Sequence, residues 1–274
     1  MPDSSDLKNI LDVLQRQRAI DFSGYKPGTL MRRIDLRLLY TATPDYAAYH
    51  RYLSDHPAEI DLLLDSLTIT VSHFFRDPLV FEILRESVIP DLTELDPPGG
   101  LRIWCAGCAR GEEPYSVSIL VREGYSRETK RVPAYILASD IDKPALAFAA
   151  QGRYLAEALA EVKKGYLDTY FCTDGDGFRV KDGIRSTVTF VRHDITSCHP
   201  PKEGVFSDYH LILCRNTLIY FNRELGEQII SCLARSLTPG GYLVLGKAES
   251  IPTELMREFR EIFPRTRIYR KGMP

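Results

Sequence analysis

The sequence predicts an α/β protein with a doubly wound, mainly parallel sheet and an all-helical domain before it. From residue 101 onward, short apolar runs alternate with helical patterns, which is typical of a parallel sheet covered by helices on both faces. The first apolar run ends in a glycine-containing turn that leads directly into a helix. Residues before about 95 instead show the periodicity of amphipathic helices.

The N-terminal region contains several helix-start signals. Thr29 is expected to cap the second helix of this region. Pro44 and Pro57 indicate two further starts, because proline is tolerated in the first turn of a helix. We therefore predict a helical domain over residues 1–95 and an α/β domain over residues 96–274.

The α/β region contains five apolar runs that we assign to the main sheet: residues 101–105, 134–139, 188–191, 209–214 and 242–245. One stretch interrupts the alternation of strands and helices. Residues 178–180 and 187–189, with turns at 174–177 and 181–183, indicate small antiparallel strands. They define a predicted β-subdomain at about residues 172–190.

The turn after the first strand is the strongest indication of a ligand site. Gly107 and Gly111 permit positive φ angles and leave no side chain between the backbone and a ligand. Glu112 and Glu113 occupy the first turn of the following helix and would repel a phosphate there. They suit a ligand with cationic groups, such as S-adenosylmethionine, which carries an ammonium and a sulfonium. Two acids that merely stabilise a helix start are an equally good explanation.

Composition excludes several classes of protein. A formal net charge of -2 argues against a general nucleic-acid binder. No apolar stretch is long enough for a membrane span and the first residues lack a signal-peptide pattern, so we expect a cytoplasmic protein without membrane insertion. Cys105 and Cys108 form a C-x-x-C pair, but no second pair or paired histidines complete a metal site. Nothing in the sequence demands more than a monomer.

The turn segment, WCAGCARGEEPYS at residues 104–116, resembles the first motif of the CheR family of chemotaxis-type protein-glutamate methyltransferases. The family phrase is W-x-x-G-C-S-T-G-E-E-P-Y-S, from which Ala109 and Arg110 depart. Four further segments resemble family motifs in the same order: residues 67–77, 138–142, 190–195 and 214–221. The resemblance implies a class I methyltransferase-like, Rossmann-like fold over nearly the whole chain. It also implies S-adenosylmethionine as cofactor and S-adenosylhomocysteine as product.

Two acids at strand ends are candidates for binding the adenosine. Asp140 ends the second predicted strand, where a carboxylate can accept both ribose hydroxyls. A helix cap is the alternative, for which Asp142 is better placed. Asp194 follows the third strand and can accept from the adenine amino group while Ile195 packs on the ring. The family usually has Asn there, and Asp cannot donate in its place.

One further segment is assigned to the methionyl group, and another to the crevice where ligands bind. By resemblance, Arg76 contacts its carboxylate with Ser72 nearby, because a guanidinium pairs bidentately with a carboxylate. A surface arginine near a helix start is the alternative. Arg215 and Asn216 end a buried apolar run, at the edge of the sheet where ligands bind. The predicted cofactor residues are Thr70, which replaces the family's Asn, Ser72, Arg76, Gly107, Gly111, Glu112, Glu113, Asp140, Asp194, Ile195, Arg215 and Asn216.

Other residues are candidates for binding the protein substrate. Tyr220 could line the acceptor pocket, although a hydroxyl satisfied within the core explains it nearly as well. Arg32, Arg33 and Arg37 form a basic stripe on the second helix, which by resemblance meets the receptor. A solvated charged face is the alternative. The turn at residues 172–177 is short, so we expect no tethering to a receptor-tail pentapeptide.

The resemblance implies methyl transfer to glutamate side chains in the cytoplasmic helices of a chemoreceptor. A glutamate with a pKa near ~4.3 is already ionised at neutral pH, so we assign no catalytic acid or base. Two alternatives remain. One is a non-catalytic signalling module that binds S-adenosylmethionine. The other is an NAD-dependent oxidoreductase, which the acids at residues 112 and 113 oppose.

Overall fold

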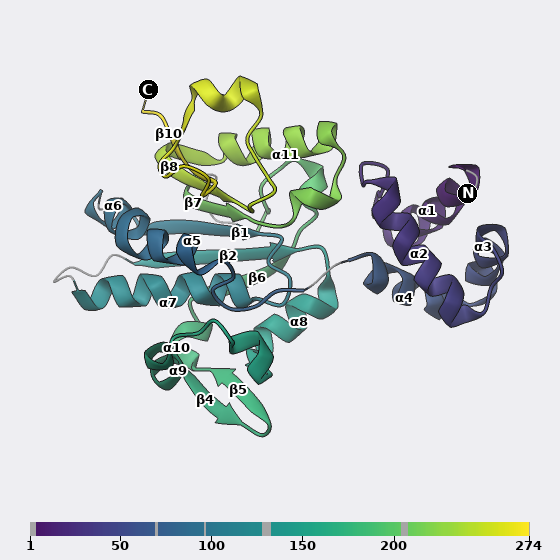
Figure 1. The fold of residues 1–274 in the computed structure, drawn as a ribbon, viewed down its shortest axis with the longest axis horizontal. Helices are drawn as coiled ribbons and strands as arrows, with labels where there is room; N and C mark the ends of the chain where they lie inside the picture. Colours follow the sequence, from purple (N-terminus) through teal and green to yellow (C-terminus); the bar gives the residue numbers. More distant parts are fainter. Residues whose placement is uncertain (1–3, 69–70, 96, 128–132, 204–207, 274) are drawn as a thin grey trace. The chain divides into compact units, whose positions relative to one another are not determined.

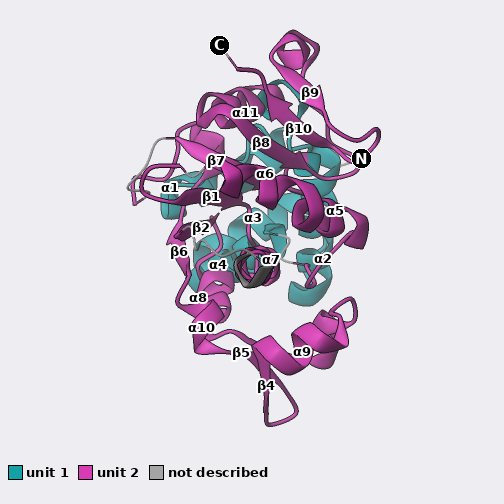
Figure 2. Cartoon of the chain, turned by 90° about the vertical axis from the view of Figure 1, so that its left-hand side faces the viewer, with its two compact units in different colours: residues 1–69, 219–226 teal, residues 70–218, 227–274 magenta. Residues whose placement is uncertain are grey.

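The structure is a computed structural model that describes residues 4–68, 71–95, 97–127, 133–203 and 208–273. Its chain forms two compact units, residues 1–69 with 219–226 and residues 70–218 with 227–274 (Figure 2). The sequence placed the domain boundary at residue 95, whereas residues 70–95 belong with the sheet. The physical reason is burial: Phe74 and Phe75 lie in the core of the second unit, and the Phe75 N–H donates to the Ser116 hydroxyl at 3.0 Å.

The first unit contains the four N-terminal helices α1 (Ser4–Arg18), α2 (Pro27–Thr41), α3 (Tyr46–Asp55) and α4 (Pro57–Leu67). Pro57 begins α4, as predicted. Thr29 is not the cap of α2, because the helix already begins at Pro27. Pro44 does not begin α3 either, since the Asp45 carboxylate caps that helix by accepting from the Ala48 N–H at 2.7 Å.

The segment 219–226 joins the first unit through backbone bonds. The Lys26 N–H donates to the Tyr220 carbonyl and the Asn222 N–H to the Gly24 carbonyl, both at 2.8 Å. Tyr25 and Phe221 form an isolated antiparallel bridge, and their rings pack edge to face at 4.7 Å. Tyr220 therefore belongs to the helical unit, although it lies only six positions after the end of β7.

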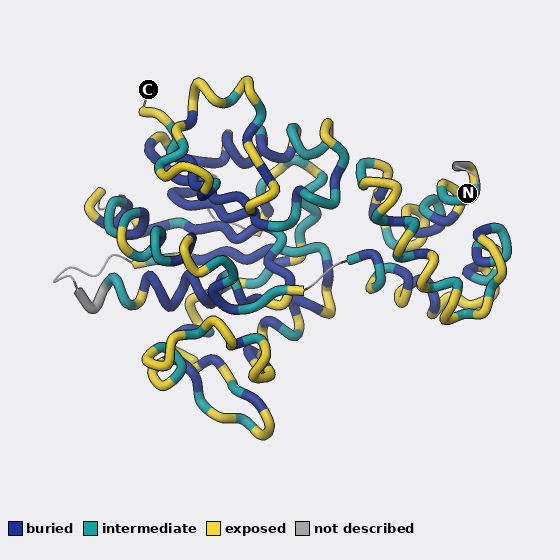
Figure 3. Tube along the Cα trace, viewed as in Figure 1, coloured by how far each residue is buried: buried dark blue, intermediate teal, exposed yellow. Residues whose placement is uncertain are grey.

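The second unit is built on a seven-stranded sheet with strand order β6-β2-β1-β7-β8-β10-β9 (Figure 1). The first five strands in that order are parallel, and β10 pairs antiparallel with β8 and β9. Continuous apolar runs explain the burial of the central strands, whose trace is dark blue in Figure 3. The strand bounds are β1 (Leu101–Ala106), β2 (Ala134–Asp140), β6 (Val188–Arg192), β7 (Tyr209–Cys214), β8 (Leu237–Leu245), β9 (Phe259–Glu261) and β10 (Ile268–Lys271).

Helices follow most of the parallel strands. The long helix α7 (Glu112–Arg127) packs on β2 and β6, and buried residues of α7 join the core around β1. The remaining helices and helical turns are α5 (Pro78–Ile83), η1 (Leu84–Val88), α6 (Ile89–Glu94), α8 (Lys143–Gln151), η2 (Ala156–Leu159), α9 (Lys164–Tyr170), α10 (Asp182–Arg185), η3 (Ile195–Ser197), η4 (Leu218–Tyr220), α11 (Arg223–Arg235) and η5 (Thr253–Arg257). Asp142 caps α8, as the sequence indicated, through the Ala145 N–H at 2.8 Å.

A second, three-stranded antiparallel sheet has the order β3-β5-β4. It comprises β3 (Arg153–Tyr154), β4 (Phe171–Asp174) and β5 (Gly177–Val180). The predicted strand at 178–180 is present, but residues 187–189 are not its partner. The strand β6, which begins at Val188, pairs parallel with β2 instead. Residues 153 and 154, outside the predicted β-subdomain, supply the third strand.

Candidate functional site

The candidate site lies at the carboxyl ends of β1, β2 and β7. From β1 the chain continues to β2 and β6 on one side, and then to β7 and β8 on the other. The connections thus reverse direction between β1 and β7, and crevices at such switch points bind ligands in α/β folds. The predicted residues 107–113, 140 and 215–216 directly follow or end these three strands. Parallel pairing therefore brings them to one edge of the sheet.

The glycine turn (residues 107–111) is shaped by close packing against its neighbours. Gly107 has φ +74° and Gly111 has φ +90°, and Ala109 between them is also left-handed. A Cβ atom on Gly107 would lie 2.3 Å from the Thr217 Oγ1. The space at Gly107 is therefore occupied by Thr217 and not left for a ligand, which corrects the predicted reason for this glycine.

Asp140 holds the glycine turn in place. Its Oδ2 accepts from the Ala109 N–H at 2.7 Å and its Oδ1 from the Asp142 N–H at 3.0 Å. Burial raises the pKa of this carboxyl above its ordinary value. Each carboxylate oxygen has a second lone pair, so the predicted role toward a ribose stays compatible with these bonds.

Arg110, which departs from the family motif, is also accounted for by packing. Its carbonyl accepts from the Tyr154 hydroxyl at 2.6 Å. Its guanidinium lies over the Phe148 ring, 5.1 Å from the centroid. The side chain is exposed and cationic, and its charge favours the ionised form of Glu112 nearby.

Glu112 is a buried acid with unused hydrogen-bonding capacity. Only 3% of the residue is exposed, and its Oε2 is buried without a partner among the described residues. Burial raises the pKa of the carboxyl to about 7, although a bond with the Ser72 side chain opposes the shift. A buried acceptor without a partner costs roughly 1–3 kcal/mol, so a bound donor would be stabilised at this position.

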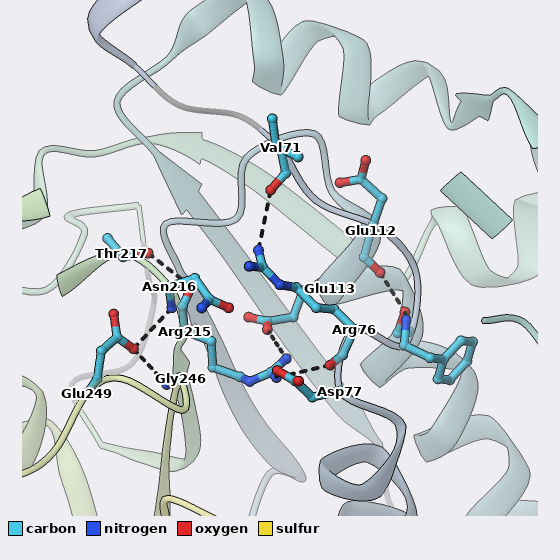
Figure 4. A network of polar contacts seen from close by, with 12 residues as sticks. Val71, Arg76, Asp77, Glu112, Glu113, Arg215, Asn216, Thr217, Gly246 and Glu249 are labelled. Atoms are coloured by element: carbon cyan, nitrogen blue, oxygen red, sulfur yellow. Dashed lines mark hydrogen bonds and ion pairs between the residues drawn. The ribbon is translucent and has the colours of Figure 1, made fainter. Parts of the chain in front are cut away.

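Glu113 has a different environment from its neighbour. Its Oε2 pairs with the Arg215 Nη1 at 3.1 Å, and Arg215 is almost fully buried (Figure 4). Arg215 Nη2 also donates to the Asp77 Oδ2 at 2.7 Å and to the Arg76 carbonyl at 3.0 Å. Burial raises the pKa of Glu113, with Arg215 opposing the shift. The predicted binding residues Glu113 and Arg215 are thus engaged with each other.

Arg76 retains donors for a ligand. Its Nη1 donates to the Val71 carbonyl at 3.4 Å, which is a long bond. No carboxylate in the described ranges lies within ion-pair distance of its guanidinium, and the residue is only partly buried. The buried rings of Phe74 and Phe75 fix the backbone beside it. Ser72 contacts Glu112, so the predicted pair 72 and 76 lies beside the start of α7. Thr70 lies outside the described residues.

Asp194 and Ile195 follow β6. The Asp194 Oδ1 accepts from the Thr196 N–H at 2.9 Å and from its hydroxyl at 2.7 Å, so this carboxylate caps η3. Both residues are half-buried. One oxygen of Asp194 thus has a local structural role that the sequence interpretation did not include.

Glu249 is a site residue that the sequence reasoning missed. It is 5% exposed, and its two oxygens accept from the backbone N–H groups of Asn216, Leu218 and Gly246. Asn216, directly after β7, has φ +59°, a left-handed conformation that asparagine adopts more readily than most residues. An acidic residue four positions after the end of β8 was the available signal.

The predicted substrate-binding residues lie in the first unit. Arg37 forms a bidentate ion pair with Glu59, with both N–O distances at 2.8 Å, and the Tyr49 hydroxyl donates to the same carboxylate. Arg37 therefore stabilises the packing of α2 and α4. Arg32 is exposed and Arg33 is half-buried. Of the three arginines of the predicted basic stripe, only Arg32 is therefore exposed.

The described residues do not form a metal site, and their cysteines and helices indicate no redox site or membrane span. No three His, Cys, Asp or Glu side chains among them gather closely enough to hold a metal ion. Cys105 and Cys108 are free, buried thiols whose pKa values burial raises. None of the described helices combines the length and apolar character that a membrane span requires.

Comparison with known proteins gives two family matches that together span most of the chain. The family model described as CheR methyltransferase, SAM binding domain, matches residues 70–268. The model described as CheR methyltransferase, all-alpha domain, matches residues 5–68. Both ranges agree with the division into two units at residues 69 and 70.

Individual relatives are similar over nearly the same length. An uncharacterized 104.1 kDa protein of Rhodobacter capsulatus is 34% identical over 98% of this chain, which spans only 28% of that relative. Cher3 of Pseudomonas putida is 31% identical over 97% of both chains. The chemotaxis protein methyltransferase of Listeria monocytogenes is 31% identical over 87% of both chains. A solved magnesium protoporphyrin IX methyltransferase from Synechocystis with bound SAH aligns at 23% identity over 61% of this chain and 55% of its own, with a TM-score of 0.32.

Proposed function

The chain belongs to the CheR methyltransferase family, and on this premise we propose that it methylates glutamate side chains in the cytoplasmic helices of a chemoreceptor. The methyl donor is S-adenosylmethionine, and the products are a glutamate methyl ester and S-adenosylhomocysteine. The name of the Listeria relative supports a role in chemotaxis. A receptor substrate of this kind places the enzyme in the cytoplasm, and we propose that it acts as a monomer.

The observation that carries the proposal is the buried, unpartnered Oε2 of Glu112. A carboxylate oxygen at this position can accept from the ammonium of a bound amino acid group. Arg76, whose guanidinium has no carboxylate partner among the described residues, can pair with the carboxylate of the same group. The two side chains thus suit the ammonium and the carboxylate on the α-carbon of a methionyl group. We assign Asp140 to the ribose, and Asp194 and Ile195 to the adenine.

The reaction requires little from acid or base groups of the protein. When bound, S-adenosylmethionine supplies a methyl group on a positively charged sulfur. The acceptor glutamate is ionised at neutral pH, because its ordinary pKa is near ~4.3. The chain therefore contributes mainly by aligning the reactants and excluding water. We assign no general base, and Tyr220 remains a proposed acceptor-pocket residue.

Receptor docking is assigned to the exposed part of the basic stripe. Arg32 and Arg33 remain in this proposal, whereas Arg37 is held by Glu59. The turn between β4 and β5 contains only residues 175 and 176, so we propose no tethering to a receptor-tail pentapeptide. Calorimetric titration with such a peptide tests this point, and tight binding would contradict it.

The decisive experiment is incubation with methyl-labelled S-adenosylmethionine and receptor cytoplasmic fragments. We expect base-labile label on the receptor, because methyl esters hydrolyse in base. A fragment whose candidate glutamates are changed to glutamine is the control and should remain unlabelled. Binding of the donor without transfer would instead identify a non-catalytic signalling module. Thermal stabilisation by NAD would favour an oxidoreductase.

A further inference from the structure

We propose that Glu249 is a positioning residue for the cofactor site and acts through the β7 turn (residues 215–218). The inference rests on the proposed function, because it concerns the same site. Glu249 lies outside the glycine turn and outside both segments that we assign to the methionyl group. Its carboxylate accepts hydrogen bonds from three backbone N–H groups, which lets it hold other residues in place.

The contacts of Glu249 join the ends of two neighbouring strands. Its Oε2 accepts from the Asn216 N–H at 3.0 Å and from the Gly246 N–H at 2.6 Å. Its Oε1 accepts from the Leu218 N–H at 2.8 Å. Asn216 and Leu218 follow β7, and Gly246 follows β8. One buried carboxylate thus satisfies three backbone donors that no strand partner reaches.

The β7 turn in turn supports the rest of the site. Arg215 pairs with Glu113 in the first turn of α7 and with Asp77 beside Arg76. Thr217 fills the space above Gly107. Asn216 between them has φ +59°, a left-handed conformation that asparagine adopts more readily than most residues with a side chain. Glu249 fixes the position of this residue through the Asn216 N–H (Figure 4).

The segment after β8 also contacts residues that hold the β7 turn. The Lys247 Nζ lies 2.5 Å from the Asp77 Oδ1, and Asp77 is also the partner of Arg215. Burial alone would raise the pKa of Asp77, but Lys247 and Arg215 hold it below its ordinary value. A Cβ atom on Gly246 would lie 2.7 Å from the Glu249 Oε2 and 2.8 Å from the Asn216 backbone N, so the absence of a side chain lets the carboxylate, the β7 turn and the end of β8 meet.

The test compares the binding of S-adenosylhomocysteine to the unmodified full chain and to five variants by calorimetry. Glu249→Gln replaces one acceptor oxygen with an NH₂ group that faces a backbone N–H. We expect binding to weaken on the order of tenfold or more, because the turn shifts relative to α7. Glu249→Asp keeps the charge and should recover part of the affinity. Glu254→Gln changes an exposed glutamate on η5 and should bind as the unmodified chain does.

Gly246→Ala disturbs the same contact from the end of β8. Its Cβ would lie 2.7 Å from the Glu249 Oε2 and 2.8 Å from the Asn216 backbone N, so it crowds this carboxylate and the turn together. If Glu249 acts through that contact, the losses of affinity in Glu249→Gln and Gly246→Ala should not add in the double variant. Glu249→Asp carries the test if Glu249→Gln does not fold, and its affinity should lie below that of the unmodified chain. Measurements are made at a temperature where circular dichroism shows each variant folded. A merely structural role would lower the melting temperature and leave the affinity of the folded chain unchanged.

The outcomes separate this inference from the proposed function. Unchanged affinity in folded Glu249→Gln overturns the positioning role. An unmodified chain that binds S-adenosylhomocysteine but labels no receptor contradicts the proposed function alone. Failure of the unmodified chain to bind contradicts the cofactor site on which both depend.

Discussion

Replacement of the Glu112 carboxylate should make the unliganded chain more stable and make it a weaker binder of S-adenosylhomocysteine. Glu112 is 3% exposed, and burial raises its pKa from 4.5 to about 7. The protonated carboxyl of Glu112 is therefore favoured more in the folded chain than in the unfolded chain. The contribution of this proton to stability is complete below pH 4.5 and is lost as the pH rises through 7.

The size of the change in the free energy of unfolding follows from this shift in the pKa of Glu112. The difference between 4.5 and about 7 corresponds to at most about 3 kcal/mol of stability lost by pH 7.5. Glu112→Gln cannot ionise, so it should unfold at a higher urea concentration than the unmodified chain at pH 7.5. At pH 4.5 the difference should largely vanish, because Glu112 is then protonated in the folded chain.

The same pKa predicts the pH dependence of binding. An ammonium ligand prefers the ionised carboxylate, and the ionised fraction of a group with a pKa near 7 falls about eightfold between pH 7.5 and 6. The affinity for S-adenosylhomocysteine should fall by about that factor over this range. Burial also raises the pKa values of Glu113 and Asp140, so the pH series must be repeated on Glu112→Gln.

Calorimetric titration at the two pH values and urea unfolding test both effects. Glu254→Gln is the matched control, because this glutamate is exposed, and it should change neither quantity. The reasoning would be refuted if Glu112→Gln bound the ligand with unchanged affinity and with the pH dependence of the unmodified chain. Lower stability of Glu112→Gln at pH 7.5 would contradict the buried, unpartnered position of the carboxylate.

Four further substitutions test other contacts. Arg76→Gln should weaken binding by about 1.5–3 kcal/mol in calorimetry, since a charged hydrogen bond is lost, and should leave urea unfolding unchanged; equal affinity would remove Arg76 from the site. Arg215→Met leaves the mostly buried carboxylates of Glu113 and Asp77 without their shared partner, although Lys247 still pairs with Asp77; it should cost about 3 kcal/mol in urea unfolding, and a cost under about 1 kcal/mol would contradict the network. Arg37→Gln should destabilise the chain by about 3 kcal/mol because Glu59 is buried, whereas Arg32→Gln should raise only the KM for receptor; the reverse pattern would contradict their assignment.

The type and order of most elements could be predicted from the sequence. Continuous apolar runs identify the central parallel strands, and capping residues such as Asp142 mark helix starts. The partners of short strands could not be predicted in this way. Residues 187–189 have the pattern of a strand, but the pattern does not say whether β2 or β5 is the neighbour. Strand pairing depends on residues distant in sequence, which periodicity does not report.

The candidate site could also be predicted only in part from the sequence. The sequence by itself determined which residue types stand at the ends of the parallel strands, because strand, turn and helix signals are local. Only the tertiary structure decided which of these residues form hydrogen bonds and ion pairs with each other and which keep a polar atom without a partner. Glu112 and Glu113 are adjacent and chemically identical, yet one keeps an unpartnered oxygen and the other pairs with an arginine 102 positions away. Glu249 likewise lies 33 positions from Asn216. Electrostatic and hydrogen-bond partners are set by distance in space, and the fold alone supplies that distance.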